Sequence, residues 1–182
     1  MRGALRQGCS YRVETVDYWR GSSGSINDIS RPVYAFWNSV LNKTDELCAL
    51  IEERPLTVKE WDNCKGVFRR QDSADELELG FSFFSLNCTS RSGILNGGII
   101  GGRDHTGTWK IDARYNKSDL IRRIRKIAYL RARIELTQLD AVEFLRTKLT
   151  DWNSKILIYM DPPYFEKGWL LYHDAYQVDD HA

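Results

Sequence analysis

The sequence has few cysteines and histidines and no long hydrophobic run, and these shortages exclude several classes of protein. The four cysteines, at positions 9, 48, 64 and 88, have neither Cys-x-x-Cys spacing nor the density of a disulfide framework, so ordinary thiols are expected. The three histidines show no metal-ligand spacing, and no metal is expected. No apolar stretch approaches the roughly 20 residues of a membrane span, and no charged-then-apolar signal opens the chain. A cytoplasmic protein without a membrane partner is therefore predicted.

The length and hydrophobic content predict one domain with an insertion. The 182 residues are 42% hydrophobic, which is enough to bury a single core. Residues 32–53 predict one long helix, and Thr57-Val-Lys-Glu60 predicts a capping box that begins a second helix ending near Arg70. Residues 71–78 are polar and predict a loop. Residues 81–109 are rich in Gly, Ser, Thr and Asn without a helical period, and they predict a loop-dominated insertion.

The most informative motif lies near the C-terminus, where an apolar run ends at two prolines. Residues 155–160, Lys-Ile-Leu-Ile-Tyr-Met, favour a strand buried on both faces. Pro162 and Pro163 lack the N–H groups that strand or helix pairing needs, so the strand is expected to end there. Asp161 would then follow the carboxyl end of a strand, where open α/β sheets bind ligands.

This motif is suited to methylation of the exocyclic amine of adenine. That nitrogen is a poor nucleophile because its lone pair is delocalised into the ring, so a catalyst must accept hydrogen bonds from its N–H groups. Asp161 and the Pro162 carbonyl are two such acceptors. Tyr164 could stack on a base flipped out of the duplex, with a contribution of ~1–3 kcal/mol. The alternative is an Asp-Pro turn with a packed tyrosine, although this tetrapeptide directly after an apolar strand is much rarer than Asp-Pro alone.

Asp161-Pro-Pro-Tyr164 resembles the catalytic motif of amino-methyltransferases that use S-adenosylmethionine. The surrounding sequence is similar to Dam-like (D12 class) adenine-specific DNA methyltransferases. Four further segments carry the resemblance, in the family's order: residues 26–37 (its second strand and following helix), 83–93 with 96–102 (its Asn-Arg-Thr and glycine-rich stretch), 135–145 (its third strand and loop) and 172–181 (the segment after the motif).

The resemblance implies a fold, a cofactor and a partner. The expected fold is α/β, a partial Rossmann-like methyltransferase sheet with a loop-rich insertion for target recognition. The expected methyl donor is S-adenosylmethionine, without a metal, and the expected substrate is double-stranded DNA. The expected catalytic residues are Asp161, Pro162, Pro163 and Tyr164, with Asp161 also beside the methionine end of the cofactor. The sequence does not indicate an oligomeric state.

Two further acids are candidate cofactor ligands. Residues 25–28 predict a short strand that ends in an acid, and a carboxylate at such a strand end can accept both ribose hydroxyls, so Asp28 is the expected ribose ligand. Residues 133–136 predict another short strand. Asp140 just after it either accepts from the adenine amine of the cofactor or caps a helix beginning at Ala141, and both roles are compatible with the sequence.

The net charge of +1 conceals a strongly basic segment. Residues 114–133 contain eight basic residues and one acid, a local balance of +7. Asn116 or Ser118 can cap a helix there, and an apolar stripe at helical spacing comprises Leu120, Ile124, Ile127 and Ala128. Four basic side chains are candidates for contact with DNA phosphates: Arg122, Arg123, Arg125 and Lys126. The alternative is a solvated face whose arginines pair with acids elsewhere.

The second candidate for DNA contact is the predicted insertion at residues 71–115. In the resembled family this region contains the target-recognition part. Asn87, Arg91 and four glycines (Gly97, Gly98, Gly101 and Gly102) are therefore expected to approach DNA. Glycines permit close backbone contact, but they are equally typical of a set of tight turns.

The sequence also departs from the family's pattern. Its members carry an Asn/Asp-Pro-Phe-x-Gly-x-Gly loop near the cofactor, which residues 1–24 do not contain, and Ala182 comes before the later strands. Residues 1–182 are therefore expected to form a single partial methyltransferase domain. Two alternatives stay open: an inactive DNA-binding remnant of such an enzyme, and an amino-methyltransferase acting on RNA or protein.

Overall fold

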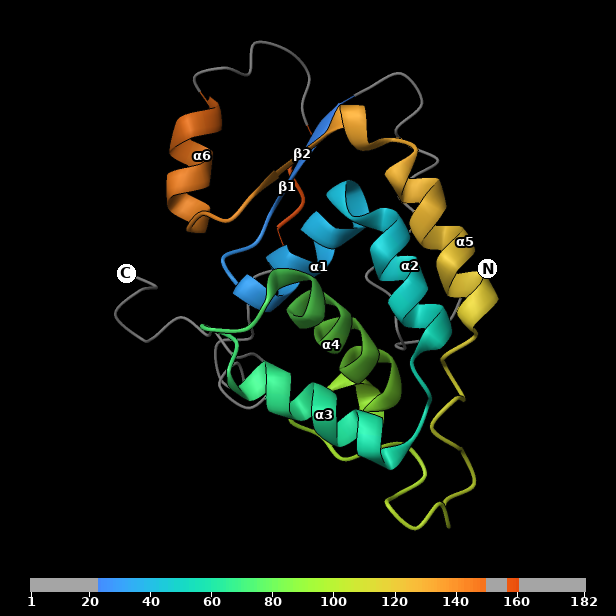
Figure 1. Ribbon diagram of the computed structural model, residues 1–182. Coiled ribbons are helices and arrows are strands. Elements are labelled where there is room, and N and C mark those ends of the chain that lie inside the picture. Colours follow the sequence, from blue (N-terminus) through green and yellow to red (C-terminus); the bar gives the residue numbers. More distant parts are fainter. Residues whose placement is uncertain (1–22, 150–156, 161–182) are drawn as a thin grey trace, which may run out of the picture.

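The structure is a computed structural model that describes residues 23–149 and 157–160 (Figure 1). In chain order its elements are β1 (Gly24–Asn27), α1 (Arg31–Asn42), α2 (Thr44–Glu53), α3 (Val58–Arg69), α4 (Glu76–Thr89), the 3-10 helix η2 (Arg91–Gly93), α5 (Lys117–Ala128), the 3-10 helix η3 (Arg131–Arg133), β2 (Ile134–Thr137) and α6 (Ala141–Leu149). The described part is thus a mostly helical α/β structure, which confirms the α/β prediction at this level.

The two strands form a small parallel sheet. Gly24 pairs with Ile134 and Asn27 with Thr137, so both strands end at the same edge. Parallel strands need a crossover connection, and here it contains all the helices from α1 to α5. Figure 1 shows α6 on one side of the strands and the other helices on the opposite side. The predicted strands at residues 25–28 and 133–136 are confirmed within one residue at each end.

The hydrophobic core lies among the helices, with α4 packed against both α1 and α3. Phe36 on α1 stacks on Phe84 on α4, with ring centroids 5.3 Å apart and an interplanar angle of 2°. Gly80 lies at the closest approach of these helices, where a Cβ would be 2.6 Å from the Ala35 carbonyl oxygen. A residue without a side chain is therefore required at this crossing.

Helix α4 corrects part of the prediction that residues 71–78 and 81–109 are loops: residues 71–75 do form turns, but residues 76–78 and 81–89 are helical. It begins at Glu76, with Asp75 accepting a hydrogen bond from the Glu78 N–H, and extends to Thr89. Every residue from Leu79 to Leu86 is buried. A helix covered on all sides has no one-sided apolar stripe, so its period was not visible in the sequence. Residues 90–116 do form turns and loops around η2, and the recognition role of residues 71–115 stays a prediction.

The predicted single helix at residues 32–53 is also wrong, because the structure has two helices there. The chain leaves helical geometry at Lys43, with φ −133° and ψ 43°, and α2 begins at the next residue. No proline or glycine marks this break. Figure 1 shows α2 turned away from the axis of α1, and α2 packs against α5.

Two predicted helix beginnings are confirmed by their caps. Thr57 accepts a hydrogen bond from the Glu60 N–H at 3.2 Å at the start of α3. Asn116 accepts from the Asp119 N–H at 3.1 Å at the start of α5. Cys48 and Cys64 are free thiols, as expected, and both are buried. Cys88 is disulfide-bonded, which the spacing did not predict.

The predicted buried strand at residues 155–160 is not formed by its described residues. Residues 157–160 have no regular secondary structure, and Leu157 and Tyr159 are 93% and 84% exposed. An apolar run becomes a strand only if a neighbouring strand pairs with its N–H and C=O groups. Among the described elements, the sheet consists of β1 and β2 alone.

None of the helices in residues 23–149 combines the length and the apolar character that a membrane crossing requires. The sequence likewise contained no such stretch.

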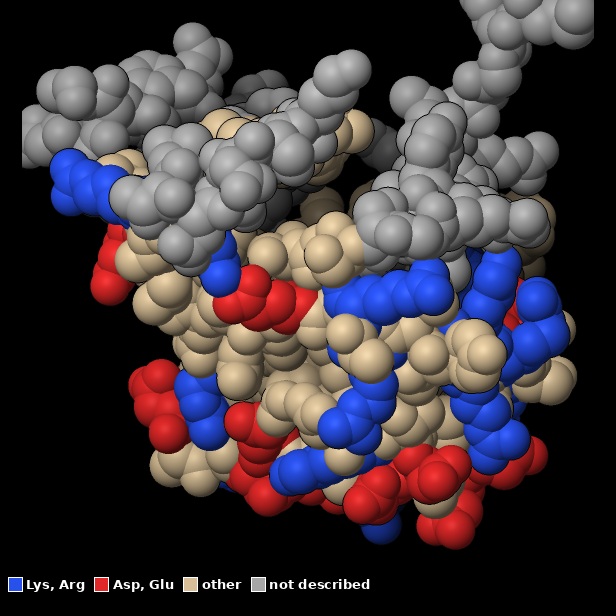
Figure 2. All heavy atoms as spheres, turned by 90° about the horizontal axis from the view of Figure 1, so that it is seen from above, with Lys and Arg blue, Asp and Glu red and all other residues tan. Residues whose placement is uncertain are grey.

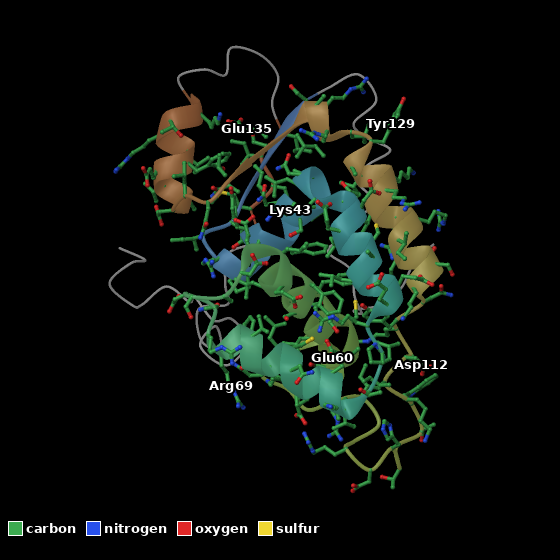
Figure 3. All side chains as sticks on the ribbon, viewed as in Figure 1. Lys43, Glu60, Arg69, Asp112, Tyr129 and Glu135 are labelled. Atoms are coloured by element: carbon green, nitrogen blue, oxygen red, sulfur yellow. The ribbon has the colours of Figure 1, made fainter. Side chains whose placement is uncertain are left out.

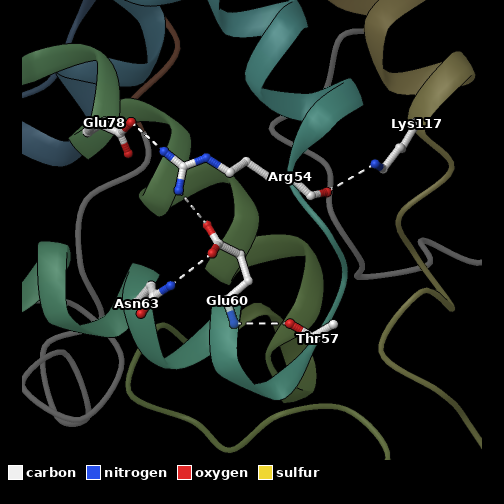
Figure 4. Close-up of polar contacts among 6 residues, drawn as sticks. All are labelled: Arg54, Thr57, Glu60, Asn63, Glu78 and Lys117. Atoms are coloured by element: carbon white, nitrogen blue, oxygen red, sulfur yellow. Dashed lines mark hydrogen bonds and ion pairs between the residues drawn. The ribbon is translucent and has the colours of Figure 1, made fainter.

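Arg54, between α2 and α3, joins four helices through a polar network (Figure 4). Its guanidinium donates to Glu60 on α3 at 3.1 Å and to Glu78 on α4 at 2.6 Å. Its backbone carbonyl accepts from Lys117 of α5 at 3.0 Å. The Glu60 side chain is only 12% exposed, so this carboxylate has little contact with water.

Replacing Arg54 by alanine is expected to lower the free energy of unfolding by about 2 kcal/mol, because Glu60 would be left nearly buried without its cation. Chemical denaturation monitored by circular dichroism measures this. Arg103→Ala is the matched control, because its pair with Asp62 is exposed (60% and 46%) and such pairs contribute little to stability. Equal losses in both variants would contradict a special role for Arg54.

Candidate functional site

The candidate site is the edge of the sheet at which both strands end. We call residues 27–30 and 137–140 the carboxyl edge. Asn27 joins its two loops: its side-chain amide donates to the Leu139 carbonyl at 2.9 Å, and its side-chain oxygen accepts from the Leu139 N–H at 3.0 Å and the Thr137 hydroxyl at 2.8 Å. The two segments are far apart in sequence, and these bonds fix them side by side.

Asp28 is held at the start of α1. Its Oδ1 accepts from the Ser30 N–H at 2.9 Å, and its own N–H donates to the Thr137 carbonyl at 3.3 Å. The side chain of Gln138 donates to the Ile29 carbonyl at 3.1 Å and ties the loops together once more. Asp28 is half-buried. The predicted ribose ligand therefore has a fixed position at the carboxyl edge.

Asp140 caps α6 from the neighbouring loop. Its Oδ1 accepts from the N–H groups of Val142 and Glu143 at 2.8 and 3.3 Å. The capping role that the sequence left open is thereby confirmed. The contact with an adenine amine stays a prediction, since one carboxylate has lone pairs for more than one donor.

Glu135 on β2 fixes the position of α6 relative to the sheet. It forms an ion pair with Lys148 of α6 and accepts from the Ser25 hydroxyl of β1 at 2.9 Å. The hydrogen bonds from Lys148 and then Ser25 hold the pKa of the Glu135 carboxyl below its usual value. Figure 3 shows Glu135 beside the strands. The ion pair holds the carboxyl-terminal end of α6 against β2. The two hydrogen bonds between Asn27 and Leu139 hold the other, capped end of α6, and with it Asp140, next to β1.

The carboxyl edge thus presents two carboxylates from adjacent loops. Such a pair can accept hydrogen bonds from hydroxyl and amine groups of a nucleoside. The predicted catalytic residues Asp161, Pro162, Pro163 and Tyr164 lie outside the described residues. Within the described part of the chain, no group of three or more His, Cys, Asp or Glu side chains could hold a metal ion.

Asn87 and Arg91, the predicted DNA contacts in the insertion, lie at the end of α4 that is remote from the carboxyl edge. Ala74 and Glu76, which precede and begin α4, contact Arg31 and Asn38 of α1, so this end of the helix is near the carboxyl edge. Residues 87 and 91 lie at the opposite end, roughly 20 Å along a helix of this length. The structure therefore does not bring these residues together with the carboxyl edge.

The predicted DNA-contact residues of the insertion differ in their exposure to solvent. Asn87 is half-buried and donates to the Gly93 carbonyl at 3.3 Å, which closes the turn after α4. Arg91 is exposed. Gly93, Gly101 and Gly102 have φ between 75° and 83°, so these glycines serve tight turns. The role of the predicted glycines in approaching DNA stays untested.

The basic helix α5 has the predicted orientation but lies away from the carboxyl edge. Leu120, Ile124 and Ile127 are buried. Among the four predicted phosphate contacts, Arg123 is half-buried and the others (Arg122, Arg125 and Lys126) are exposed. Helix α5 leads through η3 into the amino end of β2, so the structure separates these side chains from Asp28 and Asp140.

Neither the role of Asn27 nor a cavity beside the sheet was predicted from the sequence. Asn27 organises the carboxyl edge, and the only available signal was a polar residue at the end of a short strand. The cavity, of about 400 Å³, lies between α1 and β2 and is lined by Tyr34, Asn42, Arg131 and Leu136 among others. It contains none of the predicted site residues.

No family model, curated protein or solved structure matches this chain.

Proposed function

We propose that the protein is a DNA adenine-N6 methyltransferase that transfers a methyl group from S-adenosylmethionine to an adenine flipped out of double-stranded DNA. The observation that carries this proposal is the placement of Asp28 and Asp140 on adjacent loops at the carboxyl edge of two parallel strands. Open α/β sheets bind nucleotide cofactors at this kind of edge.

The strand order adds support. The segments that resemble the family's second and third strands are β1 and β2, and these two strands are paired in parallel. In a doubly wound sheet with the order 3-2-1-4, the second and third strands are neighbours. The resemblance depends on motifs within each segment, whereas the pairing joins segments that are remote in the chain, so the two agree independently.

The residues of the carboxyl edge fit a nucleoside with free hydroxyls and an amine. Asp28 would accept from the ribose hydroxyls, with its carboxylate oriented by the Ser30 N–H. Asp140 would accept from the adenine amine while it caps α6. S-adenosylmethionine supplies the methyl group when it is bound.

The target adenine would be held by the Asp-Pro-Pro-Tyr motif. Asp161 and the Pro162 carbonyl would accept hydrogen bonds from the N6 amine and draw it toward tetrahedral geometry, while Tyr164 stacks on the base. Catalysis would come from positioning and from acceptors placed where positive charge develops on the amine. The proton released from the amine would pass to Asp161 or to solvent.

A DNA-binding protein without methyl transfer is the second candidate. The exposed basic side chains of α5 favour DNA affinity whether or not a cofactor binds. Cofactor binding separates the two candidates, because only the first requires it.

Isothermal titration calorimetry with S-adenosylmethionine tests the proposal. Asp28→Ala is expected to raise the dissociation constant for S-adenosylmethionine about tenfold to a hundredfold, since hydrogen bonds to a charged group contribute about 1.5–3 kcal/mol. Asp112→Ala is the matched control, because Asp112 lies exposed on the loop before α5, far from the strands in Figure 3, and should leave the affinity unchanged.

Two results would count against the proposal. One is a dissociation constant of the unmodified protein weaker than roughly millimolar, which corresponds to about −4 kcal/mol. The other is an equal loss of affinity in both variants. Thermal unfolding of each variant shows whether Asp28→Ala has disturbed the turn that its carboxylate forms with Ser30.

A further inference from the structure

Helix α5 presents one continuous basic face to solvent. Arg122, Arg125, Lys126 and Tyr129 are spaced i, i+3, i+4 and i+7, which places them on one side of the helix. The side chains of Arg122 and Arg125 are 70% and 63% exposed, and Tyr129 is 88% exposed. We call these four residues the α5 strip. The strip is rigidly presented, because the opposite face of α5 is buried against α1 and α2.

The described acids neutralise the two arginines of the strip only weakly. Arg122 pairs with Asp119 one turn earlier, and both side chains are largely exposed. Arg125 is 3.8 Å from Asp45, whose side chain is 92% exposed. Exposed pairs of this kind contribute little to stability and exchange readily for another anion. An incoming phosphate can therefore replace these partners at little cost.

The α5 strip lies on a different part of the molecule from the candidate site. Helix α5 joins the amino end of β2 through residues 129–133, whereas Asp28 and Asp140 follow the carboxyl ends, about 13 Å further along a strand of this length. Figure 1 shows α5 across the helical layer from α6 and the end of β1. Seen from above, Lys and Arg side chains gather on the same side as α5 (Figure 2).

We propose that the α5 strip binds the phosphate backbone of double-stranded DNA independently of sequence, as a second contact separate from the carboxyl edge. The identity of DNA as the ligand rests on the proposed function. Guanidinium groups bind phosphate oxygens bidentately, and a tyrosine hydroxyl on the same face can donate to a neighbouring phosphate. A membrane surface fits less well, because amphipathic membrane helices insert their apolar face and that of α5 is occupied by the core.

The test compares two double variants of equal charge. Arg122→Gln with Arg125→Gln removes two cations from the strip, while Lys59→Gln with Arg69→Gln removes two exposed cations from α3. Fluorescence anisotropy with a short labelled duplex of arbitrary sequence, without S-adenosylmethionine, measures affinity over a range of salt concentrations. The strip variant is expected to bind about tenfold more weakly at low salt, and its salt slope should fall by about 2, since each phosphate contact contributes about 0.9.

The α3 variant should keep the affinity and the salt slope of the unmodified protein. An equal loss in both variants would show a net-charge effect and overturn the proposal, as would an unchanged slope in the strip variant. Competition by anionic phospholipid vesicles as strong as that by DNA would also overturn it. Failure of the proposed function is distinguishable, because it appears as a loss of S-adenosylmethionine binding while the duplex still binds through the strip.

Discussion

Replacing Asp161 by alanine is expected to abolish detectable methyl transfer to adenine in DNA. The side chain is proposed to accept a hydrogen bond from the N6 amine, and the positive charge that develops on this nitrogen during attack strengthens that bond. Loss of one preorganised polar group at a developing charge typically reduces turnover about 10²- to 10³-fold. Incorporation of a radiolabelled methyl group into duplex DNA measures the effect.

Asp161→Asn provides the matched control for this prediction. The amide keeps one acceptor oxygen of similar size but loses the negative charge, so its activity is expected to lie between those of Asp161→Ala and the unmodified protein. Thermal unfolding and S-adenosylmethionine affinity are measured in parallel, because the aspartate is also expected beside the methionine end of the cofactor. Near-normal turnover of Asp161→Ala would show that the site has been assigned to the wrong residues.

Features of the fold that depend on residues close together in the sequence could be predicted. The capping residues Thr57 and Asn116 accept the expected backbone hydrogen bonds. Helix α5 buries three of the four residues of its expected apolar stripe, and the fourth, Ala128, is half-buried. These are interactions within one turn of a helix, or a one-sided apolar pattern at helical spacing. The sequence alone is sufficient for them because the partners are three or four residues apart.

Features that depend on distant partners could not be predicted. Helix α4 is covered on all sides, so its sequence shows a run of apolar and small residues instead of a period. The apolar run at residues 155–160 predicts a strand, yet its described residues, 157–160, have no regular structure, because a strand forms only where another strand offers its edge. In both cases the deciding information lies in segments that are remote in the chain.

At the carboxyl edge, too, local features could be predicted from the sequence and contacts between distant segments could not. Asp28 and Asp140 could be selected because Asp28 ends one short predicted strand and Asp140 follows another. Their proximity could not be read from either segment, since it results from the pairing of β1 with β2 and from the bonds of Asn27. The separation of α5 from this edge likewise follows from strand direction, which becomes known only once the register is known.

Replacing Gly80 by alanine is expected to destabilise the protein by about 2–3 kcal/mol, the cost of forcing an atom into a closely packed contact. A Cβ at this position would lie 2.6 Å from the Ala35 carbonyl oxygen and 2.9 Å from the Phe36 Cα. Both are backbone atoms of a helix, so neither can move without shifting α1 away from α4. This loss of stability is expected even though alanine has a helix propensity about 1 kcal/mol more favourable than that of glycine.

Gly66→Ala makes the same chemical change in the interior of α3 and should raise the free energy of unfolding, whereas Gly80→Ala lowers it. The nearest atom to a Cβ there is the end of the flexible Arg70 side chain, at 3.7 Å, so nothing opposes the gain in helix propensity. Stabilisation by about 0.5–1 kcal/mol is expected. Urea denaturation of both variants measures the difference. If Gly80→Ala were as stable as Gly66→Ala, α1 and α4 could not cross as closely as their backbones do here, and the packing that supports the start of α1 and Asp28 would have to be different.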